Sequence, residues 1–410
     1  MKSITLGNTT LVTSDPSRVD APDLLVVGHS GFIAINRNIY VRLKTRGWRV
    51  ELVIPQHIPS LHPRPADPKR AEDPPIHWIE IKGSNQRFWQ FDGLANILRI
   101  RRPRAIFLEA DPASALAITL SKWARQNKTP LLCSTNENTI APLIESILRA
   151  RFLAAARTFR SLLMTSLTRN AIVQVFVLCN AAADSMKVLG FGDKVLKMPL
   201  GFDPAVFHPD KCARERIRSR YNLRFPVISY FGRVVPGKGL ELLIEALGKM
   251  MDLDWHFLID DFPSNEGRDY AGKVQTKIAN NPALVARTQK FHADHYEIAA
   301  YMNAADIIVA PSCLPEQYGR VLAEAMACGK TVVASDAGAY PELIGDCGII
   351  IPQANVEALT TTLRRIVLDV SLREDLGKRS SRRAVQFLSM DVQMDIIEQR
   401  LKELLPTGDS

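Results

Sequence analysis

Two glutamates, Glu316 and Glu324, stand with seven residues between them in the segment PEQYGRVLAEAMACGKTVVASDAGAYPEL, 315–343. Glu316 precedes the glycine at 319, and Glu324 lies in a run, VLAEAMA, that favours a helix. Carboxylates accept hydrogen bonds from neighbouring hydroxyl groups, such as those of a sugar or a ribose. One carboxylate in a loop and another in the following helix could therefore hold two sets of hydroxyls. A solvated pair of helix carboxylates is the alternative.

Two basic residues occupy a second segment, FGRVVPGKGLELLIEAL, 231–247. Arg233 and Lys238 flank a Pro-Gly turn, and the run that follows Gly239 favours a helix. Unpaired N–H groups and a partial positive charge at a helix N-terminus attract anions. An arginine fork and a lysine point charge both suit a diphosphate. The segment therefore predicts a phosphate site, with a surface turn carrying two solvated cations as the alternative.

The positions of these residues depend on the strands that precede them. Apolar runs at 227–231 and 307–310 predict two buried strands, and a third follows at 331–334. Ligands of open parallel sheets bind beyond the carboxyl ends of the strands. The loop that contains Glu316 is therefore expected at the ligand-binding edge of a sheet.

Strand and helix patterns alternate along the whole chain, which is typical of α/β architecture. Further strand patterns in the first half lie at 24–28, 49–54, 105–108, 130–133 and 174–178. The stretch KMPLGFDPAVFHPD, 197–210, is rich in Pro, Gly and Asp and is interpreted as a linker before a second series of strands. A helical pattern follows at 391–405. The chain of 410 residues thus predicts two doubly wound parallel-sheet domains.

Together these segments resemble the glycosyltransferases of the GT-B fold, in the large retaining family four, the group one transferases. The motifs that carry the resemblance are E-x7-E with the run AMACGKTVVASDAGAYPELI behind it, G-R-x-x-P-x-K-G at 232–239, and KMPLGFDPAVF at 197–207. The resemblance implies two Rossmann-like domains that face each other across a cleft, and a C-terminal helix that crosses back to the first. The expected boundaries are 1–198 for an acceptor-side domain, 199–385 for a donor-binding domain and 386–410 for the crossover helix.

The resemblance also implies roles for individual residues. Arg233 and Lys238 would hold the diphosphate of a nucleotide-sugar donor and neutralise the charge that develops as the sugar leaves. Glu316 would contact the sugar hydroxyls and act with these cations in catalysis, and Glu324 would bind the ribose. Because the two cations take the place of a metal, neither a metal nor another cofactor is expected. The other implied donor-binding residues are Gly31, Gly232, Tyr318, Gly319, Arg320 and Val321.

The first domain departs from the family pattern at its catalytic position. Many members carry a histidine at the end of a strand, where this chain reads FLEADPASA, 107–115, with Ala110 at the matching place. Glu109 is the candidate catalytic group instead. Candidate residues on the acceptor side are His29, Asp111, Glu137 and Asn138.

A basic stretch in the first half, ILRARFLAAARTFRSLLMTSLTRNAI (147–172), contains five arginines and no acid. A helix over it would carry an apolar stripe, and basic amphipathic helices lie on anionic membranes. Peripheral membrane contact, which would suit a lipid-linked acceptor, is one interpretation, and an ordinary packed helix with solvated arginines is the other. The residues of the expected stripe are Leu148, Phe152, Phe159, Leu162 and Leu163.

Composition bears on the partners and the compartment. A net charge of +9 with 46% hydrophobic residues favours a folded protein with anionic partners. The six cysteines form no C-x-x-C pair and are expected to be buried free thiols, and the N-terminal residues lack the apolar core of a secretory signal. These features predict a cytoplasmic protein, with the inner face of the membrane as an alternative setting. Nucleic acid is not expected as a partner, because no basic patch is interleaved with aromatic residues.

The predicted activity is the transfer of a sugar from a nucleotide-diphosphate sugar to an acceptor hydroxyl with retention of configuration. A hexosyltransferase-type enzyme of polysaccharide or glycoconjugate biosynthesis is expected, with a glycan or a lipid-linked molecule as acceptor. Two alternatives stay open at this point. One is a nucleotide-sugar epimerase on the same fold, and the other is a non-catalytic GT-B protein that binds a nucleotide.

Overall fold

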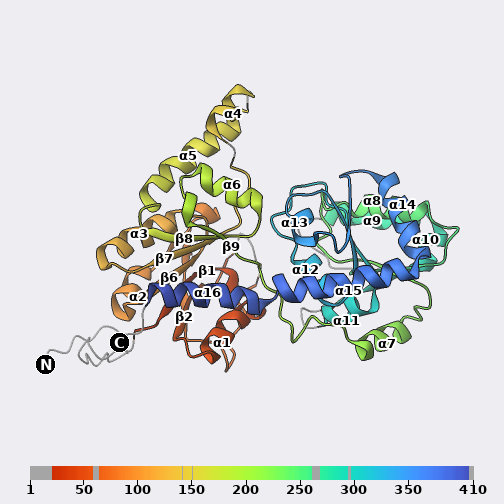
Figure 1. The fold of residues 1–410 in the computed structure, drawn as a ribbon, viewed down its shortest axis with the longest axis horizontal. Coiled ribbons are helices and arrows are strands. Elements are labelled where there is room, and N and C mark those ends of the chain that lie inside the picture. The colour runs from red at the N-terminus through yellow and green to blue at the C-terminus, as the bar shows by residue number, and fades with distance from the viewer. Residues whose placement is uncertain are drawn as a thin grey trace. The chain divides into compact units, whose positions relative to one another are not determined.

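A computed structural model describes residues 21–58, 64–140, 142–149, 151–260, 268–293 and 297–405. The chain divides into two compact units, each built on a sheet of parallel-paired strands with helices around it (Figure 1). The first unit comprises Met1–Val177, Ser185–Leu196 and Ile397–Ser410. The second unit comprises Leu178–Asp184 and Lys197–Ile396. Both units have the α/β architecture that the sequence predicts.

The sheet of the first unit has the strand order β3-β2-β1-β6-β7-β8-β9. Its strands are β1 (Leu24–Gly28), β2 (Val50–Pro55), β3 (Ile76–Ile79), β6 (Ala105–Glu109), β7 (Leu131–Thr135), β8 (Ile172–Val177) and β9 (Val195–Lys197). A two-stranded ribbon is formed by β4 (Ile81–Lys82) and β5 (Gln90–Phe91), with the short 3-10 helix η4 (Gln86–Phe88) between them. The helices are α1 (Asn38–Thr45), α2 (Leu94–Arg101), α3 (Ala115–Asn127), α4 (Leu143–Leu148) and α5 (Phe152–Thr168). Helix α6 (Asn180–Val188) begins in the second unit and ends in the first.

The sheet of the second unit has the strand order β12-β11-β10-β13-β14-β15. Its strands are β10 (Val227–Tyr230), β11 (His256–Asp260), β12 (Thr288–Phe291), β13 (Ile307–Ala310), β14 (Thr331–Ser335) and β15 (Ile349–Ile351). The helices up to β14 are α7 (Lys211–Arg220), α8 (Leu240–Gly248), α9 (Arg268–Ala279), α10 (Pro282–Arg287), α11 (Ile298–Ala304) and α12 (Arg320–Ala327). The later helices are α13 (Tyr340–Ile344), α14 (Val356–Leu368), α15 (Val370–Phe387) and α16 (Met390–Leu404). None of the described helices combines the length and the apolar content of a membrane span.

The central strands of both sheets are continuous apolar runs. Every residue of β1, β10 and β13 is buried, as expected for parallel strands that helices cover on both faces. Full burial of a valine, leucine or isoleucine side chain contributes about 1.5–3 kcal/mol. These strands therefore hold the loops at their carboxyl ends in fixed places, and the candidate site residues lie on those loops.

The stretch interpreted as a linker packs on the second unit. Phe202 and Phe207 are buried in the core of that unit, and a Cβ atom on Gly201 would lie 2.4 Å from the Cα atom of Met390. The C-terminal helix α16 begins beside this stretch, and its residues from Ile397 onward belong to the first unit. The helix thus returns to the first unit, as predicted from the sequence.

The cysteines differ from expectation at one position. Four are buried and Cys313 is half-buried, but Cys212 is exposed. Cys212 lies on α7, a strongly charged helix of which only Ala213 and Ile217 are buried. The charged composition of this helix, and not the cysteine itself, decides which face turns to the solvent.

Candidate functional site

The residues predicted to bind a donor lie on two loops at the carboxyl edge of the second sheet. The loop at 231–239 follows β10, and the loop at 311–319 follows β13. These two strands are neighbours, and the strand order reverses between them. Open α/β sheets bind their ligands at this reversal, where the following loops run to opposite sides of the sheet.

Close backbone contacts join the two loops. The Cys313 N–H donates to the Gly237 carbonyl oxygen at 2.8 Å. Gly239 has a φ of +74°, and a Cβ atom there would lie 1.9 Å from the Pro311 carbonyl oxygen. Glycine alone fits this position, because any side chain would collide with the backbone of the other loop. Helix α8 consequently begins directly against the loop that carries Glu316.

Lys238 and Glu316 form an ion pair across these loops. The Lys238 Nζ atom donates to both carboxylate oxygens of Glu316, at 2.6 and 2.8 Å. The lysine side chain is 26% exposed and the glutamate side chain 13%, so bulk water screens the pair only in part. Two residues that separate sequence motifs single out thus lie in direct contact.

Two tyrosines and a third loop surround Glu316. Burial first, and then the Glu316 charge, raise the pKa values of Tyr230 and Tyr340, and Tyr340 hydrogen-bonds to the carboxylate. The Ala339 N–H donates to the Glu316 carbonyl oxygen at 2.9 Å, and a Cβ atom on Gly338 would lie 2.3 Å from that oxygen. The loop after β14 therefore fixes the Glu316 backbone. Sequence analysis missed these tyrosines, and the glycine turn DAGAY is a signal that could have found Tyr340.

Two helix N-termini open at the same loops. Gly239 is the N-cap of α8 and Gly319 is the N-cap of α12, and neither helix has a side-chain hydrogen bond at its cap. A helix N-terminus without a side-chain cap favours an anion as a ligand. Arg320 and Val321 form the first turn of α12. Of the remaining predicted donor-binding residues, Gly232 and Arg233 follow β10, with the arginine exposed, and Tyr318 is buried before α12.

Glu324 lies on α12, one turn after Arg320. Protein atoms surround its carboxyl group, although an edge of the side chain stays open to solvent. Burial raises the pKa of this carboxyl to about 7, and the Arg320 charge lowers it by a smaller amount. Hydroxyl groups that donate to the carboxylate would favour its ionised form. Such hydrogen bonds would therefore lower the pKa of this carboxyl.

Replacing Glu324 with glutamine should stabilise the protein more at pH 8 than at pH 5. The carboxyl ionises near 4.5 in the unfolded chain and near 7 in the folded one. The free energy of unfolding of the wild type should therefore fall as the pH rises through this interval, by up to about 3 kcal/mol. Urea unfolding of both proteins at the two pH values tests this. An equal difference at both pH values would contradict it, and the exposed Glu374→Gln variant controls for removal of a helix carboxylate.

Glu109 lies at the carboxyl edge of the first sheet, where the strand order reverses between β1 and β6. Ser30 Oγ donates to Glu109 Oε2 at 2.5 Å, and the Tyr40 hydroxyl donates to Oε1. Burial raises the pKa of the Glu109 carboxyl, and these hydrogen bonds lower it by less. Both carboxyl oxygens are thus engaged inside the protein. This geometry favours a role in positioning the loop after β1 over direct contact with a substrate.

Two other candidates of the first unit lie on that loop. Gly31 is buried, and a Cβ atom there would lie 2.7 Å from Ile54 Cδ1. The His29 ring stands edge-on to the Trp89 ring, with the centroids 5.5 Å apart, and the side-chain nitrogen of Gln86 lies 3.0 Å from His29 Nε2. The histidine is therefore held by the segment around η4.

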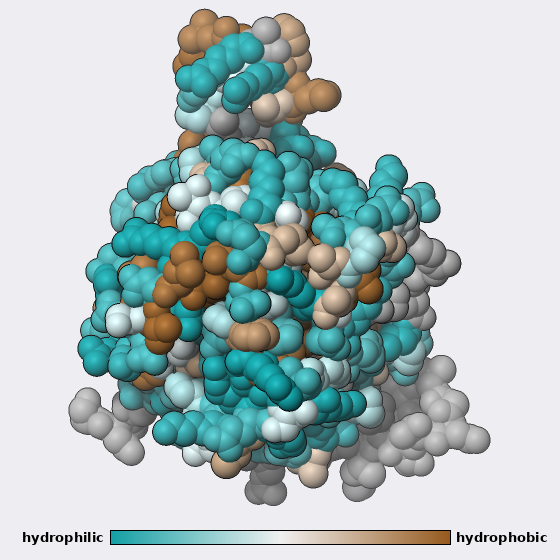
Figure 2. Space-filling view, turned by 90° about the vertical axis from the view of Figure 1, so that its right-hand side faces the viewer, coloured by the Kyte–Doolittle hydropathy of each residue, from teal (hydrophilic) through white to brown (hydrophobic). Residues whose placement is uncertain are grey.

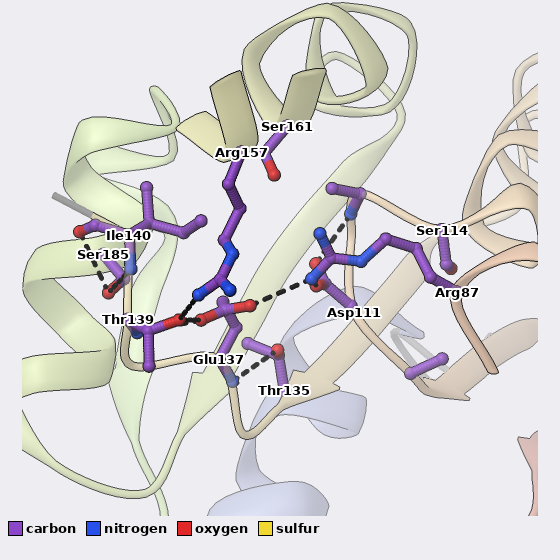
Figure 3. Close-up of polar contacts among 12 residues, drawn as sticks. Arg87, Asp111, Ser114, Thr135, Glu137, Thr139, Ile140, Arg157, Ser161 and Ser185 are labelled. Carbon is purple, nitrogen blue, oxygen red and sulfur yellow. Dashed lines mark hydrogen bonds and ion pairs between the residues drawn. The ribbon is translucent and has the colours of Figure 1, made fainter. Parts of the chain in front are cut away.

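Arg87, on η4, joins two of the predicted acceptor-side carboxylates (Figure 3). Its Nη2 atom donates to Asp111 Oδ2 at 2.7 Å and to Glu137 Oε2 at 2.9 Å. Glu137 Oε1 also accepts from the Thr139 N–H at 2.8 Å, and Arg157 of α5 donates to the Thr139 hydroxyl at 3.3 Å. This cluster follows β6 and β7 at the carboxyl edge of the first sheet.

The two carboxylates of the cluster differ in their electrostatics. Burial raises the pKa of Asp111, whereas hydrogen bonds from Thr139 and the Arg87 charge lower that of Glu137 against the effect of burial. Asn138 lies in the same loop as Glu137.

Arg87 was not predicted from the sequence, because it comes from an irregular segment. Nothing in the local pattern shows that it contacts residues 24 and 50 positions away.

The structure thus assembles the predicted residues into two groups, one in each unit. The group of the second unit lies on the loops after β10 and β13 and on α12, and comprises Gly232, Arg233, Lys238, Glu316, Tyr318, Gly319, Arg320, Val321 and Glu324. The group of the first unit comprises His29, Gly31, Glu109, Asp111, Glu137 and Asn138.

These two units and their loops define a protein of the GT-B class. A glycosyltransferase structure from Rickettsia africae matches 95% of this chain and 100% of its own, with a TM-score of 0.75 at 18% identity. Anabaena HepE, solved in complex with UDP and glucose, matches 93% of this chain and 100% of its own, with a TM-score of 0.70 at 16% identity. The likeness confirms the fold that the sequence predicts.

The match to a known family lies in the second unit. Residues 213–383 match the family described as glycosyl transferases group 1. A lipopolysaccharide core biosynthesis mannosyltransferase, LpcC of Rhizobium leguminosarum, is 30% identical over 44% of this chain and 52% of its own. A phosphatidyl-myo-inositol mannosyltransferase of Mycolicibacterium smegmatis is 28% identical over 48% of this chain and 49% of its own. The chain spans about half the length of the curated relatives it matches.

Proposed function

We propose that this protein transfers a sugar from a nucleotide-diphosphate sugar to an acceptor hydroxyl. The observation that carries the proposal is the Lys238–Glu316 pair at the strand reversal of the second sheet, beside two helix N-termini without side-chain caps. The match of residues 213–383 to the group 1 glycosyl transferases supports it. Relatives named as mannosyltransferases, and a structural neighbour solved with UDP and glucose, support a hexose donor.

The ion pair suggests how the donor is received. A diphosphate that binds at the α8 N-terminus offers Lys238 a new anionic partner in place of Glu316. Glu316 then becomes free to accept hydrogen bonds from the sugar hydroxyls, while Glu324 accepts from the ribose. As the bond to the sugar breaks, negative charge grows on the diphosphate, and Arg233 and Lys238 stabilise it most at that moment.

The first unit supplies the acceptor side in this proposal. The polar cluster of Arg87, Asp111 and Glu137 offers both donors and acceptors of hydrogen bonds at the carboxyl edge of its sheet. Retention of the anomeric configuration follows from the resemblance to family four. The setting we propose is polysaccharide or glycoconjugate assembly at the cytoplasmic face of a membrane, with a glycan or lipid-linked acceptor. This setting rests on the relatives, which are named for lipopolysaccharide core and phosphatidylinositol mannoside synthesis.

Release of the nucleoside diphosphate from a panel of donors, with UDP-glucose and GDP-mannose among them, tests the proposal. Acceptor-dependent release supports it, and NMR of the product anomeric carbon tests retention. Epimerisation of the donor without any acceptor would favour a nucleotide-sugar epimerase. Tight nucleotide binding without turnover would favour a non-catalytic protein.

Chelation of divalent metals should leave turnover almost unchanged. Arg233 and Lys238 supply the positive charge that a metal would otherwise provide, so EDTA should alter the rate by less than about twofold. A required Lewis-acid metal stabilises the transition state by several kcal/mol, and its removal should cost at least about 100-fold. Assays with EDTA, and with Mg²⁺ or Mn²⁺ added back, separate the two cases. Loss of activity that either metal restores would contradict the prediction.

A further inference from the structure

The hairpin of α4 and α5 in the first unit exposes large apolar residues, and α5 buries small and hydroxyl residues. On α5, the buried positions hold small or hydroxyl residues: Ala155, Thr158, Ser161, Thr165 and Thr168. Large apolar residues occupy the outer positions of the same helix. A surface helix of a globular protein shows the opposite arrangement, with its apolar stripe toward the core. The exposed apolar face of this hairpin is therefore a candidate binding surface.

The exposed apolar residues form one continuous stripe. On α5, Phe152, Phe159, Leu163 and Leu167 follow one another at spacings of seven, four and four residues. These spacings place the four side chains on one face of the helix. Exposed fractions are high where the two helices meet, at 80% for Leu148, 71% for Phe152 and 90% for Leu153. The hairpin projects beyond the rest of its unit, and apolar residues gather on the projecting part (Figures 1 and 2). The further members of this face are Ile144, Ile147, Phe159, Leu163 and Leu167, each at least half exposed.

Positive charge accompanies the stripe. Arg149 and Arg151 lie between the two helices, and Arg157 and Arg160 lie on α5. The described part of the hairpin contains one acid, Glu145, which pairs with Arg149 at 3.1 Å. An apolar surface ringed by arginines matches the interface of an anionic bilayer, where acyl chains lie beneath negative headgroups. A second protein would need a matching apolar face edged with acids.

We propose that the α4–α5 hairpin docks the protein on an anionic lipid surface. Leu148, Phe152 and Leu153 enter the acyl boundary, and the arginines beside them contact the headgroups. Because Arg157 of the same hairpin reaches the acceptor-side cluster through Thr139, docking brings that cluster to the membrane surface. If the proposed transferase function holds, on which this last step rests, the acceptor is a molecule anchored in that membrane.

Co-sedimentation with vesicles tests docking without any assay of turnover. The purified full chain should bind vesicles of equal parts phosphatidylcholine and phosphatidylglycerol at least about tenfold more tightly than phosphatidylcholine alone. The triple variant Leu148→Ser, Phe152→Ser, Leu153→Ser should lose at least about tenfold of this binding. The matched control changes Leu368, Val370 and Val385 to serine, three exposed apolar residues of the second unit, and should bind like the wild type.

Charge reversal tests the electrostatic part separately. Arg149→Glu with Arg151→Glu should weaken binding to the anionic vesicles by at least about tenfold. Arg216→Glu with Arg382→Glu changes the net charge equally at exposed positions elsewhere and should have little effect. Equal effects of the two pairs would mean that net charge, and not this hairpin, attracts the protein.

Two results would overturn the proposal. One is binding to anionic vesicles that the serine triple variant leaves intact. The other is absence of vesicle binding together with a dimer, seen by analytical ultracentrifugation, that the triple variant abolishes, since the hairpin would then be an interface between two copies of the chain. Nucleotide release with a water-soluble acceptor should be unchanged in the triple variant. Failure of docking and failure of the transferase proposal are thereby distinguishable.

Discussion

Replacing Lys238 with alanine is expected to lower turnover by at least about 100-fold, and replacing Glu316 with alanine should do the same. In the proposed mechanism Lys238 stabilises the charge that grows on the diphosphate leaving group, and the side chains of Lys238 and Glu316 are only 26% and 13% exposed. A stabilising charge that acts mainly in the transition state lowers kcat when it is removed. Steady-state rates of nucleotide release give the measurement. Lys249→Ala serves as the control, because this exposed lysine lies just beyond the other end of α8 and pairs with Glu357.

The double variant distinguishes catalysis from simple charge pairing. Lys238 and Glu316 neutralise each other in the structure, so each single variant leaves a partly buried charge without its partner. If the pair only stabilised the loops, the double variant Lys238→Ala, Glu316→Ala would recover activity along with stability. If both residues contact the donor, the double variant stays inactive even where its stability recovers. Recovery of turnover, or near-normal turnover in both single variants, would remove the assignment.

The strands of the second sheet could be predicted closely from the sequence. The apolar runs at 227–231, 307–310 and 331–334 correspond to β10, β13 and β14 within one residue at each end. Parallel strands that are covered on both faces must be apolar throughout, and their ends are marked by turn residues. The order of the strands, and hence the reversal between β10 and β13, depends on contacts between distant segments. The local sequence pattern does not show these contacts, and the strand order comes from the structure.

The partners of the candidate residues were less predictable than their positions. The contacts of Glu316 with Tyr230 and Tyr340 depend on how the loops after β10, β13 and β14 meet at one edge of the sheet. Arg87 contacts Asp111 and Glu137, which are so far from it in the sequence that no motif spacing predicts the contacts. Side chains of this kind become visible only when the sheet brings its loops together.

The basic stretch shows a different limit of sequence analysis. A period of 3.6 residues indicates that α5 is amphipathic, and the sequence shows an apolar stripe there. It does not show which face the protein buries, because the buried face consists of alanine, serine and threonine, which suit either environment. Only the structure shows that Ser161 and Thr165 are buried. It also shows that Phe159 and Leu163 are exposed.

Replacing Gly239 with alanine should destabilise the second unit by about 3 kcal/mol or more. The φ of +74° is strained for any residue with a side chain, and the added Cβ atom would lie 1.9 Å from the Pro311 carbonyl oxygen. Because that oxygen belongs to backbone, relief requires the α8 N-terminus to move away from the loop that carries Glu316. The same movement would separate Lys238 from Glu316, so nucleotide affinity should fall together with stability.

Gly248→Ala, at the far end of the same helix, is the matched control for this prediction. A Cβ atom at Gly248 would meet no heavy atom within 4 Å, and replacing a glycine by alanine in a helix typically stabilises it by up to about 1 kcal/mol. Urea unfolding of the two variants and the wild type, with nucleotide binding by calorimetry, gives both readouts. A Gly239→Ala variant as stable as the wild type would show that α8 and Pro311 separate at little cost. The close contact between the two loops would then not be what holds the cations against the carboxylate.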